Sequence, residues 1–197
     1  GQTIGTDATP VFGGAKVNYG YASCDDVEKV YTNAEVSDVP LDHNYVNGIC
    51  STCEGYEMAT DSNSDGTYEI GNAGQLFWFA AHVNSGNRSS KAVMTADIDL
   101  ENRPWTPIGL YKADPFIDLS YTGTFDGQKH IIKNLNVHVT DGREAGFFSR
   151  TRNASLSNFG IVNATIVSDP IDGSSYRAGV VGGEVHLSTV NNVYTSG

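Results

Sequence analysis

The chain has 197 residues, enough for one sizeable domain or for a small module of a larger protein. Its 12 Lys and Arg against 23 Asp and Glu give a net charge of −11. Such an acidic surface repels phosphate backbones, which excludes nucleic acid as an expected partner. No apolar run approaches the roughly 20 residues of a membrane-spanning helix, so we expect no membrane insertion.

Residues 1–60 show no sustained apolar period and hold all three cysteines, so we expect a small irregular module there. Cys50 and Cys53 form a C-x-x-C pair, and His43 and Cys24 lie upstream. Three thiolates and an imidazole are a valid structural zinc set, and four protein ligands leave no open position for catalysis. The pattern predicts structural zinc at these four residues. A Cys50–Cys53 disulfide with Cys24 reduced, or three reduced thiols, remain alternatives.

The next polar tract matches the first half of a calcium-binding loop. Oxygen ligands stand at Asp61, Asn63, Asp65 and Glu69, with glycine at the sixth loop position. The twelfth position is Asn72, where the full motif requires a bidentate Glu. The same residues make a good polar turn ahead of a strand, and we favour the turn over a calcium site.

A helix is predicted at about residues 72–84. Asn72 suits an N-cap, and Gln75 stands three residues later in the capping-box position. Apolar residues follow with helical spacing, and Asn84-Ser85-Gly86 is typical of a helix end. An isolated amphipathic helix ahead of strands would cover an exposed apolar end, so we expect it to cap them.

A two-part motif recurs three times in the segment 67–197. The first part reads Gly123-Thr-Phe125, Gly146-Phe-Phe148 and Gly179-Val-Val181. The second part reads Ile132-Lys-Asn134-Leu135, Leu156-Ser-Asn158-Phe159 and Val190-Asn-Asn192-Val193. Apolar residues alternate around these motifs, which indicates strands. A fixed motif order with turns of variable length is typical of stacked repeats.

We therefore predict an all-β fold: a right-handed parallel β-helix (solenoid) over 67–197, with one N-terminal capping helix and the irregular Cys/His module before it. Within it, Asn134, Asn158 and Asn192 would form a structural ladder of hydrogen-bonded amides. An antiparallel sandwich is the alternative all-β fold. Since the pattern is still running at Gly197, we expect further coils after it.

Five blocks support a family resemblance: Tyr68-Glu-Ile70-Gly-Asn-Ala-Gly-Gln75-Leu76-Phe-Trp78-Phe79-Ala80, Ala96-Asp97-Ile98-Asp99-Leu100, Trp105-Thr-Pro107-Ile108-Gly109, Tyr121-Thr-Gly-Thr-Phe125-Asp126-Gly127 and Ile132-Lys-Asn134-Leu135. Together they resemble the β-helical repeat domains with the GLUG motif, which occur in bacterial surface proteins. Similar segments precede the protease domain of immunoglobulin A-specific metallopeptidases. The resemblance implies an adhesin-like repeat platform without catalytic residues. The segment 43–53 also resembles small zinc-ribbon-like inserts in surface proteins of the same bacteria.

The candidate catalytic carboxylates are Asp97, Asp99 and Asp126. We interpret them as turn and corner residues that accept backbone N–H bonds, since a glycosidase pair would need two carboxylates facing one another across a cleft. The sequence contains no Gly-x-Ser-x-Gly elbow, His-Glu-x-x-His or phosphate loop. We therefore expect no catalytic residue and no organic cofactor.

The expected function is a non-catalytic module of a secreted or cell-surface bacterial protein, either an adhesion or interaction platform or a rigid stalk. Its partner would be a host or cell-surface ligand, protein or glycan, and its location extracellular. Two alternatives stay open, because fold alone does not determine function. One is a part of a carbohydrate-active β-helix enzyme, and the other is an accessory N-terminal region of a secreted protease.

Overall fold

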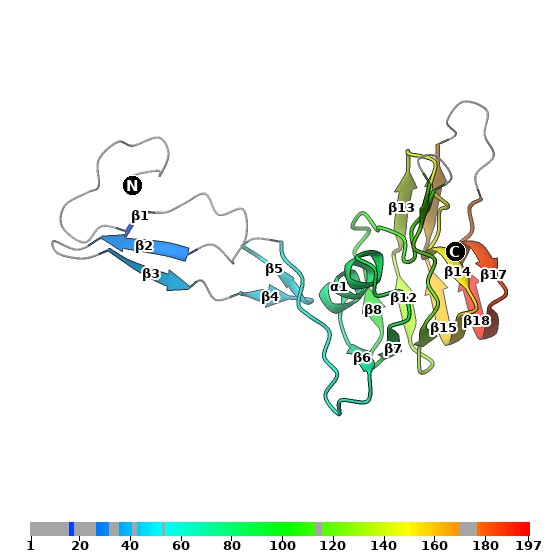
Figure 1. Ribbon diagram of the computed structural model, residues 1–197, viewed down its shortest axis with the longest axis horizontal. Coiled ribbons are helices and arrows are strands. Elements are labelled where there is room, and N and C mark those ends of the chain that lie inside the picture. Colours follow the sequence, from blue (N-terminus) through cyan, green and yellow to red (C-terminus); the bar gives the residue numbers. More distant parts are fainter. Residues whose placement is uncertain are drawn as a thin grey trace. The chain divides into compact units, whose positions relative to one another are not determined.

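The computed structural model describes residues 16–17, 27–31, 36–40, 43–52, 54–112, 116–169 and 177–197. The chain divides into two compact units, Gly1–Glu57 and Met58–Gly197 (Figure 1). Strands dominate both units, and over the described ranges there is one helix, of 12 residues.

Antiparallel pairing characterises the strands of the first unit. One sheet comprises β1 (Lys16–Val17), β2 (Val27–Tyr31) and β3 (Val36–Pro40), and a hairpin comprises β4 (Tyr45–Val46) and β5 (Ile49–Cys50). The hairpin turn residues Asn47 and Gly48 have φ angles of 50° and 73°. Two successive positive φ angles match the twist of paired strands, and Asn-Gly is a preferred sequence for such a turn. The prediction of an irregular module is therefore wrong for the described part of this unit.

Parallel pairing joins the strands of the largest sheet, in the second unit. Its members are β6 (Thr67–Ile70), β7 (Lys91–Met94), β8 (Ile98–Asp99), β11 (Thr124–Asp126), β12 (Ile131–Lys133), β15 (Ser155–Val162) and β18 (Thr189–Ser196). β15 is central: one half pairs with β11, the other half with β12, and most of its length with β18.

Three two-stranded sheets complete the second unit. They are parallel β13 (Asn136–Val139) with β16 (Thr165–Ser168), parallel β14 (Phe148–Arg152) with β17 (Gly182–His186), and antiparallel β9 (Tyr111–Lys112) with β10 (Ile117–Asp118).

The predicted right-handed parallel β-helix is wrong as a description of this chain. Its strands form separate, small sheets with mixed parallel and antiparallel pairing, and none of these sheets forms a solenoid. The motif alignment also misjudged the register, since Leu156 pairs with Phe125 and Ile132 pairs with Ile161. The reason is that β15 pairs with two shorter strands. Its first residues adjoin β11, which holds the first part of the earlier motif, and its last residues adjoin β12, which holds the second part.

Aromatic side chains build the core of the second unit. Phe125 is fully buried, and its ring centroid lies 5.6, 5.9 and 5.4 Å from those of Phe147, Phe148 and Phe159. Trp105 stacks on Phe147 at 5.1 Å, and its indole N–H donates to the Phe147 carbonyl at 3.0 Å. Burying each phenyl ring contributes about 1.5–3 kcal/mol. Aromatic side chains from separate segments of the chain thus pack together in one core.

Helix α1 (Ala73–Asn84) occupies the range in which the sequence predicts a helix. The Asn72 side chain accepts a hydrogen bond from the Gln75 backbone N–H at 2.9 Å, and the Gln75 side chain accepts one from Gly71 N–H at 2.7 Å. These bonds satisfy amides that a helix start leaves without intrahelical partners. Phe79 on the buried face approaches Phe125, with ring centroids 6.4 Å apart.

Candidate functional site

The predicted zinc ligands lie only partly within the described residues. Cys24 and Cys53 fall outside them, and His43 and Cys50 fall inside. Cys50 ends β5 and is 1% exposed. Its Sγ accepts a hydrogen bond from the backbone N–H of Thr52 at 3.4 Å.

His43 lies two residues before the hairpin that contains Cys50. Its imidazole is exposed and stacks on the Tyr45 ring, with centroids 5.1 Å apart. Tyr45 pairs directly with Cys50, and His43 lies two residues before Tyr45. Within the described ranges no three His, Cys, Asp or Glu side chains converge as a metal site. Zinc at this hairpin stays a prediction.

The polar tract that begins at Asp61 forms a turn in which backbone N–H groups donate hydrogen bonds to the carboxylates. Asp61 accepts from the N–H of Asp65 at 3.0 Å and from the N–H of the following glycine at 2.8 Å. Asp65 accepts from Thr67 N–H and from the Asn63 amide, at 2.8 and 2.9 Å. The Thr67 side chain, more than Asn63, lowers the pKa of Asp65. Glu69 lies beyond the turn and accepts from a serine hydroxyl. These contacts make the polar turn that the sequence favours.

The three predicted ladder residues divide between two places. Asn192 Nδ2 donates to Asn158 Oδ1 at 3.0 Å, across β18 and β15. Asn158 Nδ2 donates in turn to Asp126 Oδ1 at 3.0 Å, on β11. Asn134 lies elsewhere and donates to Asp99 Oδ1 at 2.8 Å. The ladder in the structure is therefore Asp126–Asn158–Asn192.

The three candidate catalytic carboxylates all accept backbone hydrogen bonds. Asp97 accepts from Ile131 N–H at 3.0 Å, Asp99 from Glu101 N–H at 2.8 Å, and Asp126 from the N–H of a turn residue at 3.0 Å. These backbone donors are the main reason that the pKa values of Asp97 and Asp99 are lowered. Carboxylates held ionised by fixed donors suit a structural role better than proton transfer at neutral pH.

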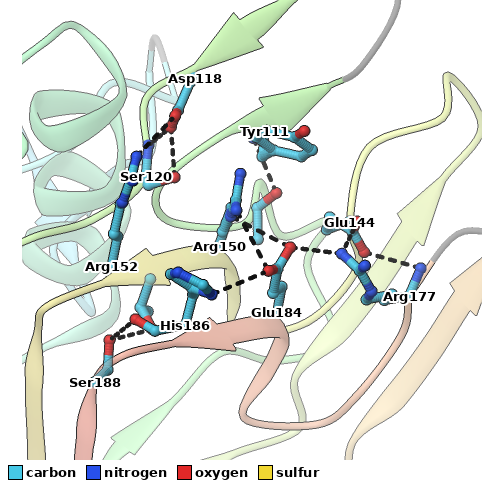
Figure 2. Close-up of polar contacts among 12 residues, drawn as sticks. Tyr111, Asp118, Ser120, Glu144, Arg150, Arg152, Arg177, Glu184, His186 and Ser188 are labelled. Atoms are coloured by element: carbon cyan, nitrogen blue, oxygen red, sulfur yellow. Dashed lines mark hydrogen bonds and ion pairs between the residues drawn. The ribbon is translucent and has the colours of Figure 1, made fainter.

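An ion-pair network centres on Arg150 of β14 and Glu184 of β17 (Figure 2). Arg150 donates from Nη2 to Glu184 Oε1 at 3.3 Å, while its Nε lies 3.2 Å from Oε2 without a hydrogen-bond angle. Arg177 contacts Glu184 and also Glu144, the latter at 3.3 Å, and its backbone N–H donates to Glu144 at 2.8 Å. The Arg150 guanidinium also lies 4.2 Å from the ring centroid of Tyr111.

Charge in this network is balanced. Two guanidinium groups, on Arg150 and Arg177, face two carboxylates, on Glu144 and Glu184. Burial raises the pKa of Glu144, although the Arg177 N–H and guanidinium act in the opposite direction. The side chains of Arg150 and Glu184 are only 15% and 18% exposed. Each carboxylate is engaged by an arginine, which suits cross-strand stabilisation better than acid–base chemistry.

Sequence reasoning missed this network, although a signal for it existed. Arg150 and Glu184 are 34 residues apart, and Glu144 and Arg177 are 33 apart. The ladder amides Asn158 and Asn192 are also 34 apart. Opposite charges 33 or 34 residues apart, the same separation as the ladder amides, therefore indicate an ion pair between adjacent strands.

The last two strands and the turn between them carry four exposed apolar side chains within a short segment, which we name the β17–β18 surface. It comprises Val185, Leu187, Val190 and Tyr194, which are 39%, 73%, 45% and 54% exposed. These are four of the eleven exposed large apolar side chains in the described part of the chain, and they fall within ten residues. A clustered apolar surface marks a binding site more often than scattered single residues do.

Leu187 stands in an unfavourable backbone conformation on this surface. Its φ angle is 48°, in the left-handed region, where a Cβ is crowded. Arg152 pairs with His186, so the matching position of the preceding repeat is Asn153, whose φ angle is 54°. Asparagine is one of the few residues that tolerate this conformation. The turn thus has a suitable residue in one repeat and an exposed leucine in the next.

Comparisons with known proteins identify no relative. No family model, no curated protein sequence and no solved structure matches this chain. Over the residues that the structure describes, no helix has the length and apolar character needed to cross a membrane.

Proposed function

We propose that this chain is a non-catalytic interaction module that binds a polypeptide partner through the β17–β18 surface. The observation that carries the proposal is Leu187. It is 73% exposed and adopts a left-handed conformation that costs a branched side chain about 1–2 kcal/mol. Strained residues of this kind cluster at functional sites, where the surrounding structure sustains them. An exposed side chain contributes little to folding, so an exposed leucine in this conformation supports a role in binding.

The neighbouring side chains support the same function. Val185 precedes the Leu187 turn, and Val190 and Tyr194 follow it on β18. An apolar anchor flanked by further apolar contacts is the usual composition of the centre of a protein interface.

The charged groups favour binding over catalysis. Each network carboxylate is engaged by an arginine, and Asp97, Asp99 and Asp126 accept backbone N–H bonds. A carbohydrate-active enzyme therefore has less support. The extracellular, adhesin-like setting remains part of the proposal and rests on the sequence resemblance alone.

A random peptide display library, panned on the full chain, tests this function. The matched selection uses Leu187→Asn, which restores the residue found at the equivalent turn and removes the apolar anchor. We expect peptides that bind the wild-type chain and lose at least about tenfold in affinity on the variant, as for removal of an interface hot spot. Equal enrichment on both proteins, or none on either, refutes the proposal. Release of reducing ends from polysaccharides by the purified chain would refute it in favour of the carbohydrate-active alternative.

A further inference from the structure

The last turn of α1 holds a histidine whose ring makes two aromatic contacts. His82 stacks on Trp78, with ring centroids 4.8 Å apart and an angle of 13° between the planes. Tyr68, on β6, meets the same imidazole with its ring tilted by 68°, at a centroid distance of 5.1 Å. These two neighbours hold the imidazole in one orientation and remove part of its surface from water.

Both ring nitrogens of His82 have polar neighbours in the segment Ser85–Ser90, which leads from α1 to β7. Nε2 lies 3.2 Å from the Ser90 hydroxyl, and Nδ1 lies 3.4 Å from the side-chain nitrogen of Asn87. The Asn87 NH2 group also donates to the His82 carbonyl oxygen at 3.1 Å. A carbonyl oxygen only accepts, so it fixes the orientation of the Asn87 amide. Nδ1 is then an acceptor, and the single ring proton of the neutral imidazole lies on Nε2.

A second proton on His82 creates a mismatch in either orientation of the Asn87 amide. With the amide as it stands, the new N–H on Nδ1 faces the Asn87 NH2 group, a donor against a donor. If the amide rotates by 180°, its oxygen accepts from Nδ1 but then faces the His82 carbonyl oxygen, an acceptor against an acceptor. The segment Ser85–Ser90 therefore has to rearrange before it can accommodate the imidazolium.

The charges around the imidazole do not compensate for this mismatch. Among the described residues, the groups in contact with it are neutral: the Tyr68 phenol from β6, Trp78 from α1, and Asn87 and Ser90 from the connecting segment. The guanidinium of Arg88, in the same segment, donates to the Asp118 carbonyl at 3.2 Å. Burial lowers the pKa of His82, which agrees with a site that favours the neutral ring.

The segment Ser85–Ser90 also contacts the residues that lead into β11. The Thr122 backbone N–H donates to the Arg88 carbonyl, and the Tyr121 hydroxyl donates to the Ser90 carbonyl, both at 2.8 Å. β11 is the strand that pairs with β7. A rearrangement of this segment consequently reaches the contact between α1 and the parallel sheet.

We propose that His82 is a pH-sensitive lock on the segment Ser85–Ser90, closed while the imidazole is neutral and released when the ring gains a second proton. The lock is separate from the proposed function, because it involves α1, β6 and β7 and none of the residues of the β17–β18 surface. The pKa of His82 in the fold lies below its ordinary value of 6.5. Its contribution to stability is therefore complete above pH 6.5 and is lost as the pH falls toward the folded value.

An NMR titration of the five histidines in the full chain tests the role of the amide. The variant His82→Gln assigns the His82 signal by its loss. We expect Asn87→Ala to raise the pKa of His82 by at least about half a unit, because it removes the fixed donor that opposes protonation. Ser89→Ala is the matched control, since Ser89 is an exposed residue of the same segment. Equal pKa values of His82 in Asn87→Ala and Ser89→Ala overturn the proposal.

Hydrogen exchange, followed by mass spectrometry, tests the release itself. The amides of Ser85–Ser90 are compared about one pH unit above and below the measured pKa of His82, after correction for the intrinsic effect of pH. We expect exchange at least about threefold faster at the lower pH in the wild-type chain, and no such change in His82→Gln. The same acceleration in both proteins, or in neither, refutes the lock. If His82→Gln fails to fold, the exchange comparison uses Asn87→Ala, in which the acceleration should be smaller than in Ser89→Ala. Peptide binding to the β17–β18 surface enters neither measurement, so the two proposals fail separately.

Discussion

Replacing Leu187 by asparagine should stabilise the second unit while it weakens binding. The left-handed conformation at φ 48° costs leucine about 1–2 kcal/mol, most of which asparagine avoids. The side chain is 73% exposed, so only about a quarter of the 1.5–3 kcal/mol for full leucine burial is lost, roughly 0.5 kcal/mol. The net expectation is a gain of about 0.5–1 kcal/mol.

Urea unfolding followed by tryptophan fluorescence measures this change. Both tryptophans, Trp78 and Trp105, belong to the Met58–Gly197 unit, so the signal reports that unit alone. Leu187→Ala is the matched control, because it removes the same contacts without relieving the backbone, and it should lose about 0.5 kcal/mol. Asn153→Leu is the reverse control and should lose about 1 kcal/mol. The reasoning fails if Leu187→Asn is no more stable than Leu187→Ala.

Three further predictions concern the polar groups. Glu184→Gln should lower the free energy of unfolding in urea by about 2 kcal/mol, because it leaves the largely buried Arg150 without its counter-ion. The control Glu101→Gln, in an exposed ion pair, should lower it by under about 0.5 kcal/mol. Equal losses would contradict a structural role for the network. The pKa of Asp99 is lowered in the fold, so its contribution is present above the unfolded value of 3.8 and is lost as the pH falls through the folded value. Asp99→Asn should therefore be less stable at pH 7 and lose less stability on acidification, and an unchanged acid-unfolding curve would exclude this linkage. Mass spectrometry of the purified chain should find one zinc per chain that Cys50→Ser abolishes; a metal-free wild-type chain with one titratable thiol would indicate a disulfide.

Local patterns in the sequence predicted local structure well. Asn72 and Gln75 are the two residues whose side chains make the capping bonds at the start of α1. The tract from Asp61 makes a polar turn, because short carboxylates bond to backbone N–H groups a few residues away. Both features depend on neighbours in the chain.

Pairing between distant segments was predicted less well. The alignment of Asn134 with Asn158 is chemically reasonable, yet Asn134 bonds to Asp99 and the ladder begins at Asp126. Similar motifs do not specify which of two nearby strands each half of β15 will adjoin. The packing of Phe125 against Phe159 and the separate sheets around them decide that register.

The sequence by itself determined the strand-rich character, the position of α1, the acidic charge and the polar turn, because each depends on composition or on residues a few places apart. Only the tertiary structure decided the set of small separate sheets, the balanced Arg150–Glu184 network and the direction of the amide ladder. Those features depend on which residues, some 32–34 positions apart, become neighbours. Long-range pairing is selected by packing and hydrogen bonding over the whole unit, which no local pattern encodes.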